Sequence, residues 1–242
     1  MNIYIYVVAH NEEFMLPYFM RHYKQFSNNI TLWDNESTDS TVEIAKDMGA
    51  NVVRFDTGGA FYEAKNVEMK NSYYKRDRGK SDWAIVVDVD ELIWHPDLAG
   101  ILKIYKKEKI TVPLVDGYEM ISDIPPKLNG QIYDEIKTGM PSRWYCKRAV
   151  FDPVVDINFG IGSHFCKPTG TVRNSSKADI KLLHYRLLGI EYLISRWKVR
   201  LSRQSDENKK NGWNPIVSTD PEKVRNWIKE YTSKCIPRQV IP

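Results

Sequence analysis

The stretch Ile85-Val86-Val87-Asp88-Val89-Asp90-Glu91-Leu92 decides the fold, because an apolar run ends abruptly in three carboxylates. The run is too short to span a membrane and predicts a strand buried on both faces of a parallel sheet. Its acids then lie at the carboxyl end of the strand, where open α/β sheets bind their ligands. Asp88 and Asp90, two positions apart, could both reach one hard cation through oxygen. Acids also follow strands because loops are solvated, so the stretch alone does not distinguish a site from a loop.

The sequence before this stretch alternates between strand and helix patterns. β-branched and aromatic runs predict strands at residues 3–9, 30–33 and 51–55. Helices are expected from Pro17, from the capping box formed by Ser40 and Glu43, and over residues 61–74. This alternation predicts right-handed βαβ units and a largely parallel sheet.

The pattern loosens after Pro96, where Pro- and Gly-bearing loops separate the expected elements. The candidate strands there cover residues 118–121, 143–151 and 179–184. Two amphipathic helices are expected near the end of the chain, over residues 190–201 and 221–231.

Composition restricts the class of protein. The chain has 242 residues, of which 42% are hydrophobic and 27% charged, as in ordinary globular proteins. A net charge of +4 permits anionic ligands but is too small for a dedicated nucleic-acid binder. Three widely spaced cysteines argue against a disulfide framework. With neither a signal peptide nor a long apolar run, a cytoplasmic protein is expected, and its aromatic, basic tail could contact a membrane peripherally.

Three acidic or amide-bearing motifs stand at three expected strand ends: Ala9-His10-Asn11-Glu12-Glu13, Asp34-Asn35-Glu36-Ser37-Thr38-Asp39-Ser40-Thr41 and Asp88-Val89-Asp90-Glu91. In order and spacing they resemble glycosyltransferase family 2, whose members have the GT-A fold. The resemblance covers about residues 3–95 and includes Ala64-Lys65-Asn66, where the family has Ala-Arg-Asn.

Two later segments resemble a bacterial and viral subgroup of the same family. One runs from Trp144-Tyr145-Cys146-Lys147-Arg148 to Gly160-Ile161-Gly162-Ser163-His164, and the other is Leu183-His184-Tyr185-Arg186. The resemblance implies an α/β GT-A (nucleotide-diphospho-sugar transferase) fold with a mostly parallel central sheet, flanking helices and a C-terminal helical extension. The implied division is a catalytic domain over 1–188, with a nucleotide-sugar half (1–95) and an acceptor half (96–188), followed by the extension (189–242).

The resemblance further implies transfer of a sugar from a nucleotide donor, such as a UDP-sugar, with Mn²⁺ (or Mg²⁺) bridging the two phosphates. The implied metal ligands are Asp88, Asp90 and His184, with His164 as a rival to His184. The acceptor is left open between a glycan, a lipid-linked intermediate, a protein and a nucleic-acid base. The residues implied to bind the nucleotide-sugar are Ala9, Asn11, Glu12, Asp34, Asn35, Lys65, Asp88, Val89 and Asp90.

Inverting transfer needs a carboxylate that removes the proton of the acceptor hydroxyl. The candidates in the second half are Asp116, Glu119, Asp152 and Asp156. Asp156 is favoured because it directly precedes the glycine-bearing loop with His164. The family's usual Glu-Asp pair is not evident, which leaves the stereochemical outcome open. Arg186 and the basic positions of the following helix could neutralise phosphate.

Other functions share parts of this pattern. A phosphatase of the haloacid dehalogenase type would use Asp88 as nucleophile and Asp90 as acid/base, but Leu92 and Ile93 replace the small residues usual there. A nucleotidyltransferase also uses paired acids and a metal, but its glycine-rich basic loop is replaced here by acidic His10-Asn11-Glu12-Glu13. A glycan- or nucleic-acid-binding module could use the many aromatic residues, yet stacking needs no acid pair.

Overall fold

Two five-stranded sheets form the centre of the computed structural model, which describes residues 1–127, 129–216 and 218–242. The first sheet has the order β3-β2-β1-β4-β8, in which β3, β2, β1 and β4 are parallel and β8 is antiparallel to β4. Its strands are β1 (Ile3–Ala9), β2 (Asn29–Asp34), β3 (Asn51–Arg54), β4 (Trp83–Asp88) and β8 (Val150–Phe151).

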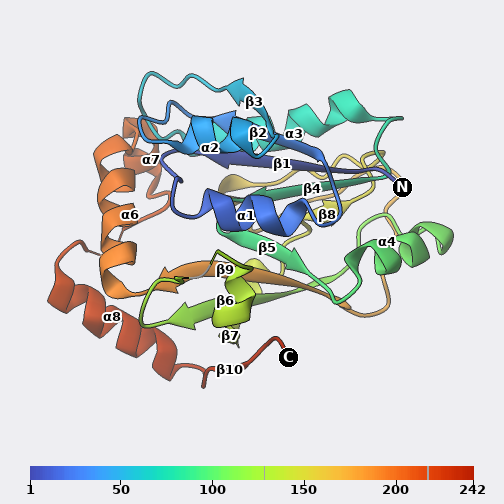
Figure 1. Ribbon diagram of the computed structural model, residues 1–242. Helices are drawn as coiled ribbons and strands as arrows, with labels where there is room; N and C mark the ends of the chain where they lie inside the picture. Colours follow the sequence, from blue (N-terminus) through green and yellow to red (C-terminus); the bar gives the residue numbers. More distant parts are fainter. Residues whose placement is uncertain (128, 217) are drawn as a thin grey trace.

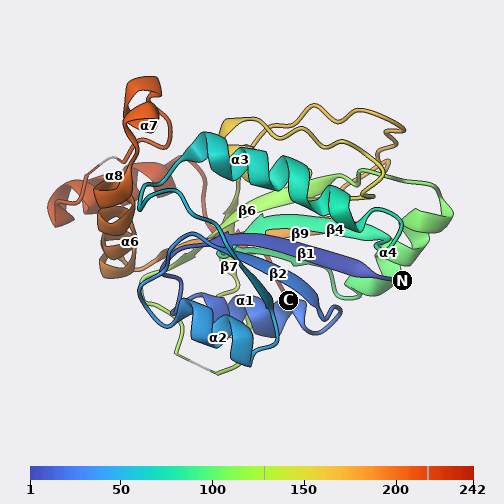
Figure 2. The same ribbon diagram turned by 90° about the horizontal axis from the view of Figure 1, so that it is seen from above.

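Helices cover both faces of this sheet. Figure 2 shows α1 (Leu16–Tyr23) and α2 (Thr41–Asp47) on one face and α3 (Glu63–Ser72) on the other. Side chains alternate between the faces, so Ile5 of β1 packs in the core cluster with α1, while Tyr6 packs in the cluster with α3. Burial on both faces explains why β1 and β4 are nearly continuous apolar runs.

The chain leaves the first sheet directly after Asp88 and enters the second through β5 (Glu91–Trp94). The second sheet has the order β10-β7-β6-β9-β5. In its register, His184 of β9 lies between Glu91 of β5 and Glu119 of β6. The remaining strands are β6 (Val115–Ser122), β7 (Thr138–Pro141), β9 (Ile180–Leu188) and β10 (Arg238–Gln239).

The C-terminal helices stand at the carboxyl ends of the parallel strands (Figure 1). Leu187 of β9 packs with Trp197 of α6 and Val224 of α8 in a third apolar cluster. The chain then returns to the second sheet, where β10 pairs with β7. The helical extension expected over residues 189–242 did not include the strand β10. The helices of this part are α6 (Ile190–Arg203), α7 (Asp206–Asn211) and α8 (Pro221–Ser233).

The predicted α/β fold class is confirmed, with sheets flanked by helices. The expected strand over 143–151 is wrong except at its end, because only β8 is a strand and residues 143–145 form a 3₁₀ turn, η2 (Arg143–Tyr145). This turn packs on Gly117 so closely that a Cβ there would meet the Tyr145 carbonyl carbon at 2.1 Å. Among the described residues, no helix has the length and apolarity needed to cross a membrane. The other short elements are α4 (Leu98–Lys107), α5 (Ile132–Glu135), η1 (Tyr73–Asp77) and η3 (Ile161–Ser163).

The His22 side chain of α1 is buried against β5 of the second sheet, and this burial makes the stability of the protein depend on pH. Its Nε2 lies 2.9 Å from the Ile93 carbonyl oxygen, and burial lowers the pKa of His22 to about 4. An unfolded chain binds this proton near pH 6.5, so acidification from 6.5 to 4 favours unfolding. We expect this group to remove ~2 kcal/mol of unfolding free energy between pH 7 and pH 5. Urea unfolding of wild type and His22→Gln at both pH values measures it, and equal losses in the two proteins would contradict it.

Candidate active site

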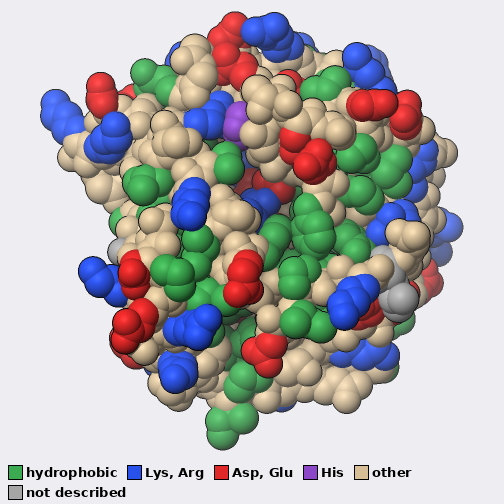
Figure 3. Space-filling view, turned by 60° about the vertical axis from the view of Figure 1, so that its left-hand side comes forward, with side chains coloured by type: hydrophobic (Ala, Val, Ile, Leu, Met, Phe, Trp, Pro, Cys, Tyr) green, Lys and Arg blue, Asp and Glu red, His purple; other side chains and the backbone are tan. Residues whose placement is uncertain are grey.

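A cleft of about 650 Å³ opens at the carboxyl ends of β1, β2 and β4 and is lined in part by α6. Figure 1 shows α6 beside the ends of these strands. On the face of the molecule drawn in Figure 3, acidic and basic side chains lie inside a hollow. The cleft is lined by the loops after these strands, by one face of α3 and α6, and by the segments around Tyr145 and His164. It lies at the edge of the sheet where parallel α/β folds bind ligands.

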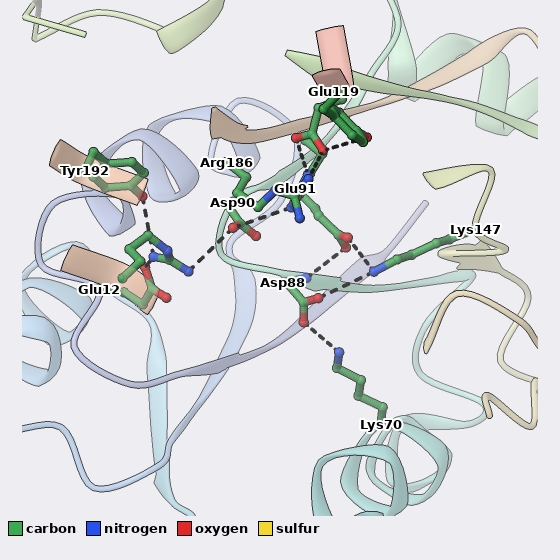
Figure 4. A network of polar contacts seen from close by, with 12 residues as sticks. Glu12, Lys70, Asp88, Asp90, Glu91, Glu119, Lys147, Arg186 and Tyr192 are labelled. Carbon is green, nitrogen blue, oxygen red and sulfur yellow. Dashed lines mark hydrogen bonds and ion pairs between the residues drawn. The ribbon is translucent and has the colours of Figure 1, made fainter. Parts of the chain in front are cut away.

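Asp88 is held by two lysines at the end of β4 (Figure 4). Its Oδ1 lies 2.6 Å from Lys70 Nζ of α3, and its Oδ2 lies 3.4 Å from Lys147 Nζ. Lys147 also pairs with Glu91, and both of these side chains are buried. Burial alone would raise the pKa of the Asp88 carboxyl, but the two ammonium groups outweigh burial and hold that pKa well below its usual range. Asp88 is therefore an ionised carboxylate with one lysine near each of its oxygens.

Asp90 faces a different set of partners, across the cleft from the lysines. Its Oδ2 lies 3.6 Å from His184 Nε2 and 3.5 Å from Arg196 Nη2 of α6. Arg196 also pairs with Glu12 from the loop after β1. Burial opposes ionisation of Asp90, yet the charges of His184 and Arg196 keep its pKa well below the usual range. Three distant segments thus meet at one buried carboxylate.

Glu119 of β6 fixes the orientation of His184. Its Oε1 lies 2.7 Å from His184 Nδ1, and its Oε2 accepts a hydrogen bond of 2.7 Å from Arg186 Nη2. The Tyr145 ring stacks on the imidazole with centroids 4.0 Å apart. Burial would lower the pKa of His184, but the carboxylates of Glu119 and Asp90 raise it to about 9. With Nδ1–H directed to Glu119, Nε2 points toward Asp90.

The other end of the cleft carries amide and carbonyl groups beside the charged side chain of Arg203. Asn11 has a positive φ of 52°, and its side-chain Oδ1 accepts a hydrogen bond of 2.8 Å from the Thr38 amide. Arg203 of α6 donates to Asn35 Oδ1 at 2.9 Å, and His10 Nδ1 lies 2.8 Å from the Asn35 carbonyl oxygen. Amide and carbonyl groups of this kind suit the edges of a base or ribose.

Most of the residues expected to bind the nucleotide-sugar come together in this cleft. The cleft is lined by Ala9, Asn11, Glu12, Asn35, Asp88, Val89 and Asp90. His184 and its rival His164 line it as well. Asp34 is buried behind the lining and accepts from the Ser37 amide at 3.2 Å. Lys65 is exposed with its Nζ over the Tyr62 ring, outside the lining.

The favoured base, Asp156, is not brought to the cleft. Its carboxylate binds Lys75 at 2.9 Å and Arg78 at 2.6 Å, and these bonds hold its pKa below the usual range. A carboxylate neutralised by two cations outside the cleft cannot serve an acceptor bound within it, so we assign Asp156 no role there. His164, in the glycine-bearing loop that follows Asp156, does line the cleft.

Sequence reasoning missed the cleft-lining residues of α3, while the basic positions of α6 were expected only as a group. On α3 the cleft is lined by Glu63, Asn66 and Lys70, which are spaced i, i+3 and i+7 on one helical face. Arg196, Arg200 and Arg203 share one face of α6 in a similar way, with the spacing i, i+4 and i+7. Helical periodicity could have identified the α3 residues and would have selected Lys70 instead of Lys65.

The donor set of the cleft can be tested for a divalent cation. The described residues contain no ready group of three His, Cys, Asp or Glu side chains that could hold a metal ion. Asp90 Oδ2 and His184 Nε2, however, converge to 3.6 Å. Adjacent ligands of a Mg²⁺-like ion lie about 3 Å apart, and such ions are often held by one or two protein groups plus phosphate and water. The pair fits that mode once a cation displaces the proton of His184 Nε2, while Asp88 is already neutralised by its lysines.

Comparison with models of protein families gives no match, and comparison with curated proteins gives none either. Some solved structures are similar. Glucosyl-3-phosphoglycerate synthase of Mycobacterium tuberculosis matches with 19% identity and a TM-score of 0.33, over 49% of this chain and 44% of its own. In a complex of that synthase with Mn²⁺, UDP-glucose and phosphoglyceric acid, the values are 18%, 0.34, 49% and 44%. S. aureus TarS (1–349) matches with 12% identity and a TM-score of 0.46, over 96% and 72%.

This chain therefore spans less than half the length of the mycobacterial synthase. Because these identities lie below 20% and the TM-scores below 0.5, the similarities do not define a function for this chain.

Proposed function

We propose that this protein is a glycosyltransferase that moves a sugar from a nucleoside-diphosphate donor, most simply a UDP-sugar, to an acceptor hydroxyl. The observation that carries the proposal is the convergence of Asp90 and His184 at the carboxyl edge of a parallel sheet, inside a cleft of about 650 Å³. A cavity of this size suits a nucleotide-sugar.

Within the proposal, Asp90 and His184 hold Mn²⁺ (or Mg²⁺), and Asn11 and Asn35 contact the nucleoside. A metal bound there would offset the charge that develops on the departing diphosphate. Arg196 and Arg200 of α6 line the same cleft and contribute further positive charge toward the phosphates. Asp88, held by Lys70 and Lys147, is oriented to accept from a ribose or sugar hydroxyl.

Screening nucleotide-sugars for Mn²⁺-dependent hydrolysis tests the proposal. Release of UDP from at least one UDP-sugar, lost when the metal is chelated, is the expected result. Phosphate release from p-nitrophenyl phosphate without any nucleotide-sugar turnover would favour a phosphatase instead. Thermal stabilisation by an oligonucleotide but not by UDP with Mn²⁺ would favour a binding module.

Glu119→Gln should weaken Mn²⁺-dependent UDP binding without unfolding the protein. Glu119 holds His184 through Nδ1. Loss of the hydrogen-bond partner that orients a metal-binding histidine weakens metal binding about 10- to 100-fold. Isothermal titration calorimetry with UDP at fixed Mn²⁺ gives the change. Tyr231→Phe is the matched control, because the Tyr231 hydroxyl approaches the other oxygen of Glu119 at 3.5 Å and should matter little. Equal affinities for Glu119→Gln and wild type would remove Glu119 from this role.

A further inference from the structure

His164 lines the cleft but takes no part in its ion-pair network. Its Nδ1 lies 2.9 Å from the Trp144 carbonyl oxygen. A carbonyl oxygen only accepts, so Nδ1 carries the hydrogen and Nε2 of the neutral ring keeps a lone pair. Over residues 1–127, 129–216 and 218–242, no hydrogen-bond partner of Nε2 is found. The imidazole therefore offers a free acceptor to whatever enters the cleft.

The local sequence holds this ring in a fixed position. Gly162 has a φ of +76°, and a Cβ there would lie 3.0 Å from His164 Cδ2 and 3.6 Å from Nε2. The Gly162 amide donates to Glu63 Oε1 at 2.9 Å, which ties the turn to α3. The Trp144 and Tyr145 rings contact the imidazole edge-on, with centroids 5.5 and 5.7 Å away. The Gly-x-His pattern thus has a physical purpose, since only glycine satisfies both the turn and the ring.

The groups around His164 are those of the end of the cleft where Asp90 and His184 would hold the metal and the diphosphate. The charged and titratable groups that act on it are Lys147, Asp88 and His184, whereas His10 lies among Arg203, Asp34 and Asp39 at the nucleoside end. Burial, followed by the charge of Lys147, lowers the pKa of His164 to about 4. The ring is therefore uncharged at neutral pH, and its Nε2 carries no hydrogen.

The carboxylates nearby are already engaged. Asp88 and Glu91 bind Lys147, and Asp90 binds Arg196. Glu63 accepts from the Gly162 amide and, at 2.7 Å, from Asn214 Nδ2. Asp88, Asp90 and Glu91 are thus bound to cations and Glu63 to two neutral donors, whereas His164 Nε2 has no hydrogen-bond partner among the described residues and is open to an acceptor hydroxyl.

We infer that His164 is the catalytic base that deprotonates the acceptor hydroxyl, an inference that rests on the proposed glycosyl transfer. The hydroxyl proton passes to Nε2 while the acceptor oxygen forms a bond to the anomeric carbon. The bond from that carbon to the diphosphate oxygen breaks, and its electron pair leaves with UDP. Nε2 then releases the proton to water. This is a single displacement and inverts the anomeric configuration.

Two nucleophiles that differ in their need for a base provide the test. Water must lose a proton when it attacks the sugar, whereas azide carries none. With the UDP-sugar found by screening and Mn²⁺, His164→Ala and His164→Gln should hydrolyse the donor about 10²- to 10⁴-fold more slowly than wild type. Glycosyl azide should form at rates within about threefold of wild type and with inverted configuration by NMR.

Calorimetry with UDP and Mn²⁺ shows whether each variant keeps a folded donor site, and retained affinity is expected for at least His164→Gln. Three outcomes would overturn the role of His164 and leave the proposed glycosyl transfer intact. They are undiminished hydrolysis by the variants, equal losses of rate with water and azide, and a product of retained configuration. Loss of UDP binding in both variants would also overturn the role of His164, because the imidazole would then serve only structure. Absence of turnover by wild type with every nucleotide-sugar would instead overturn the proposed function.

Discussion

Asp90→Asn should nearly abolish Mn²⁺-dependent turnover of the nucleotide-sugar while the protein stays folded. The substitution keeps the shape of the side chain but removes its charge, and with it one of the two converging ligands. Metal stabilisation of a leaving phosphate amounts to several kcal/mol, so a loss of roughly 10³-fold is expected. Rates of UDP release at saturating Mn²⁺ measure the effect.

Asp156→Asn is the matched control for this experiment. The same chemical change is made on a carboxylate that lies outside the cleft and binds Lys75 and Arg78. Its turnover should remain within about twofold of wild type, because exposed ion pairs contribute little. Turnover that survives in Asp90→Asn, or that fails in Asp156→Asn, would reverse the roles assigned to these two acids.

Lys147→Met should cause the largest loss of stability among single substitutions in the cleft. Lys147 and Glu91 are 3% and 1% exposed, and Asp88 shares the same ammonium group. Removing the cation leaves a buried carboxylate without a partner, which costs about 3–5 kcal/mol. For a chain of this length the melting temperature should fall by about 6–20 °C. Calorimetric or circular-dichroism melting measures the change.

Two further variants separate this effect from the loss of any lysine. Lys147→Met combined with Glu91→Met should recover much of the stability, since the uncompensated charge is removed and the new side chains are apolar. Lys75→Met breaks an exposed ion pair and should change the unfolding free energy by less than about 1 kcal/mol. A double variant as unstable as Lys147→Met would show that the pairing is not the cause.

The elements of the first sheet could be predicted because their signals are local. The apolar runs of β1 and β4 are buried on both faces, and each ends at the polar residues that line the cleft. Strand alternation with helices was sufficient to bring Asn11, Asn35 and Asp90 to one edge.

The partners of these residues could not be predicted in the same way. Glu119 meets His184 only because β6 and β9 are neighbours, and this order is set by packing over the whole chain. Arg196 reaches Glu12 from 184 positions away. Asp156 shows the converse, because an acid beside a glycine-bearing loop has the same local pattern whether it faces the cleft or, as here, a lysine and an arginine outside it.

The most direct test of the central claim is the anomalous diffraction signal of manganese in a crystal of the protein grown with Mn²⁺ and UDP. The account predicts one strong peak within coordination distance of the Asp90 carboxylate and His184 Nε2, with both phosphates of UDP on the same ion and the nucleoside near Asn11 and Asn35. A peak elsewhere, or UDP bound in the cleft with no metal at Asp90 and His184, would contradict it.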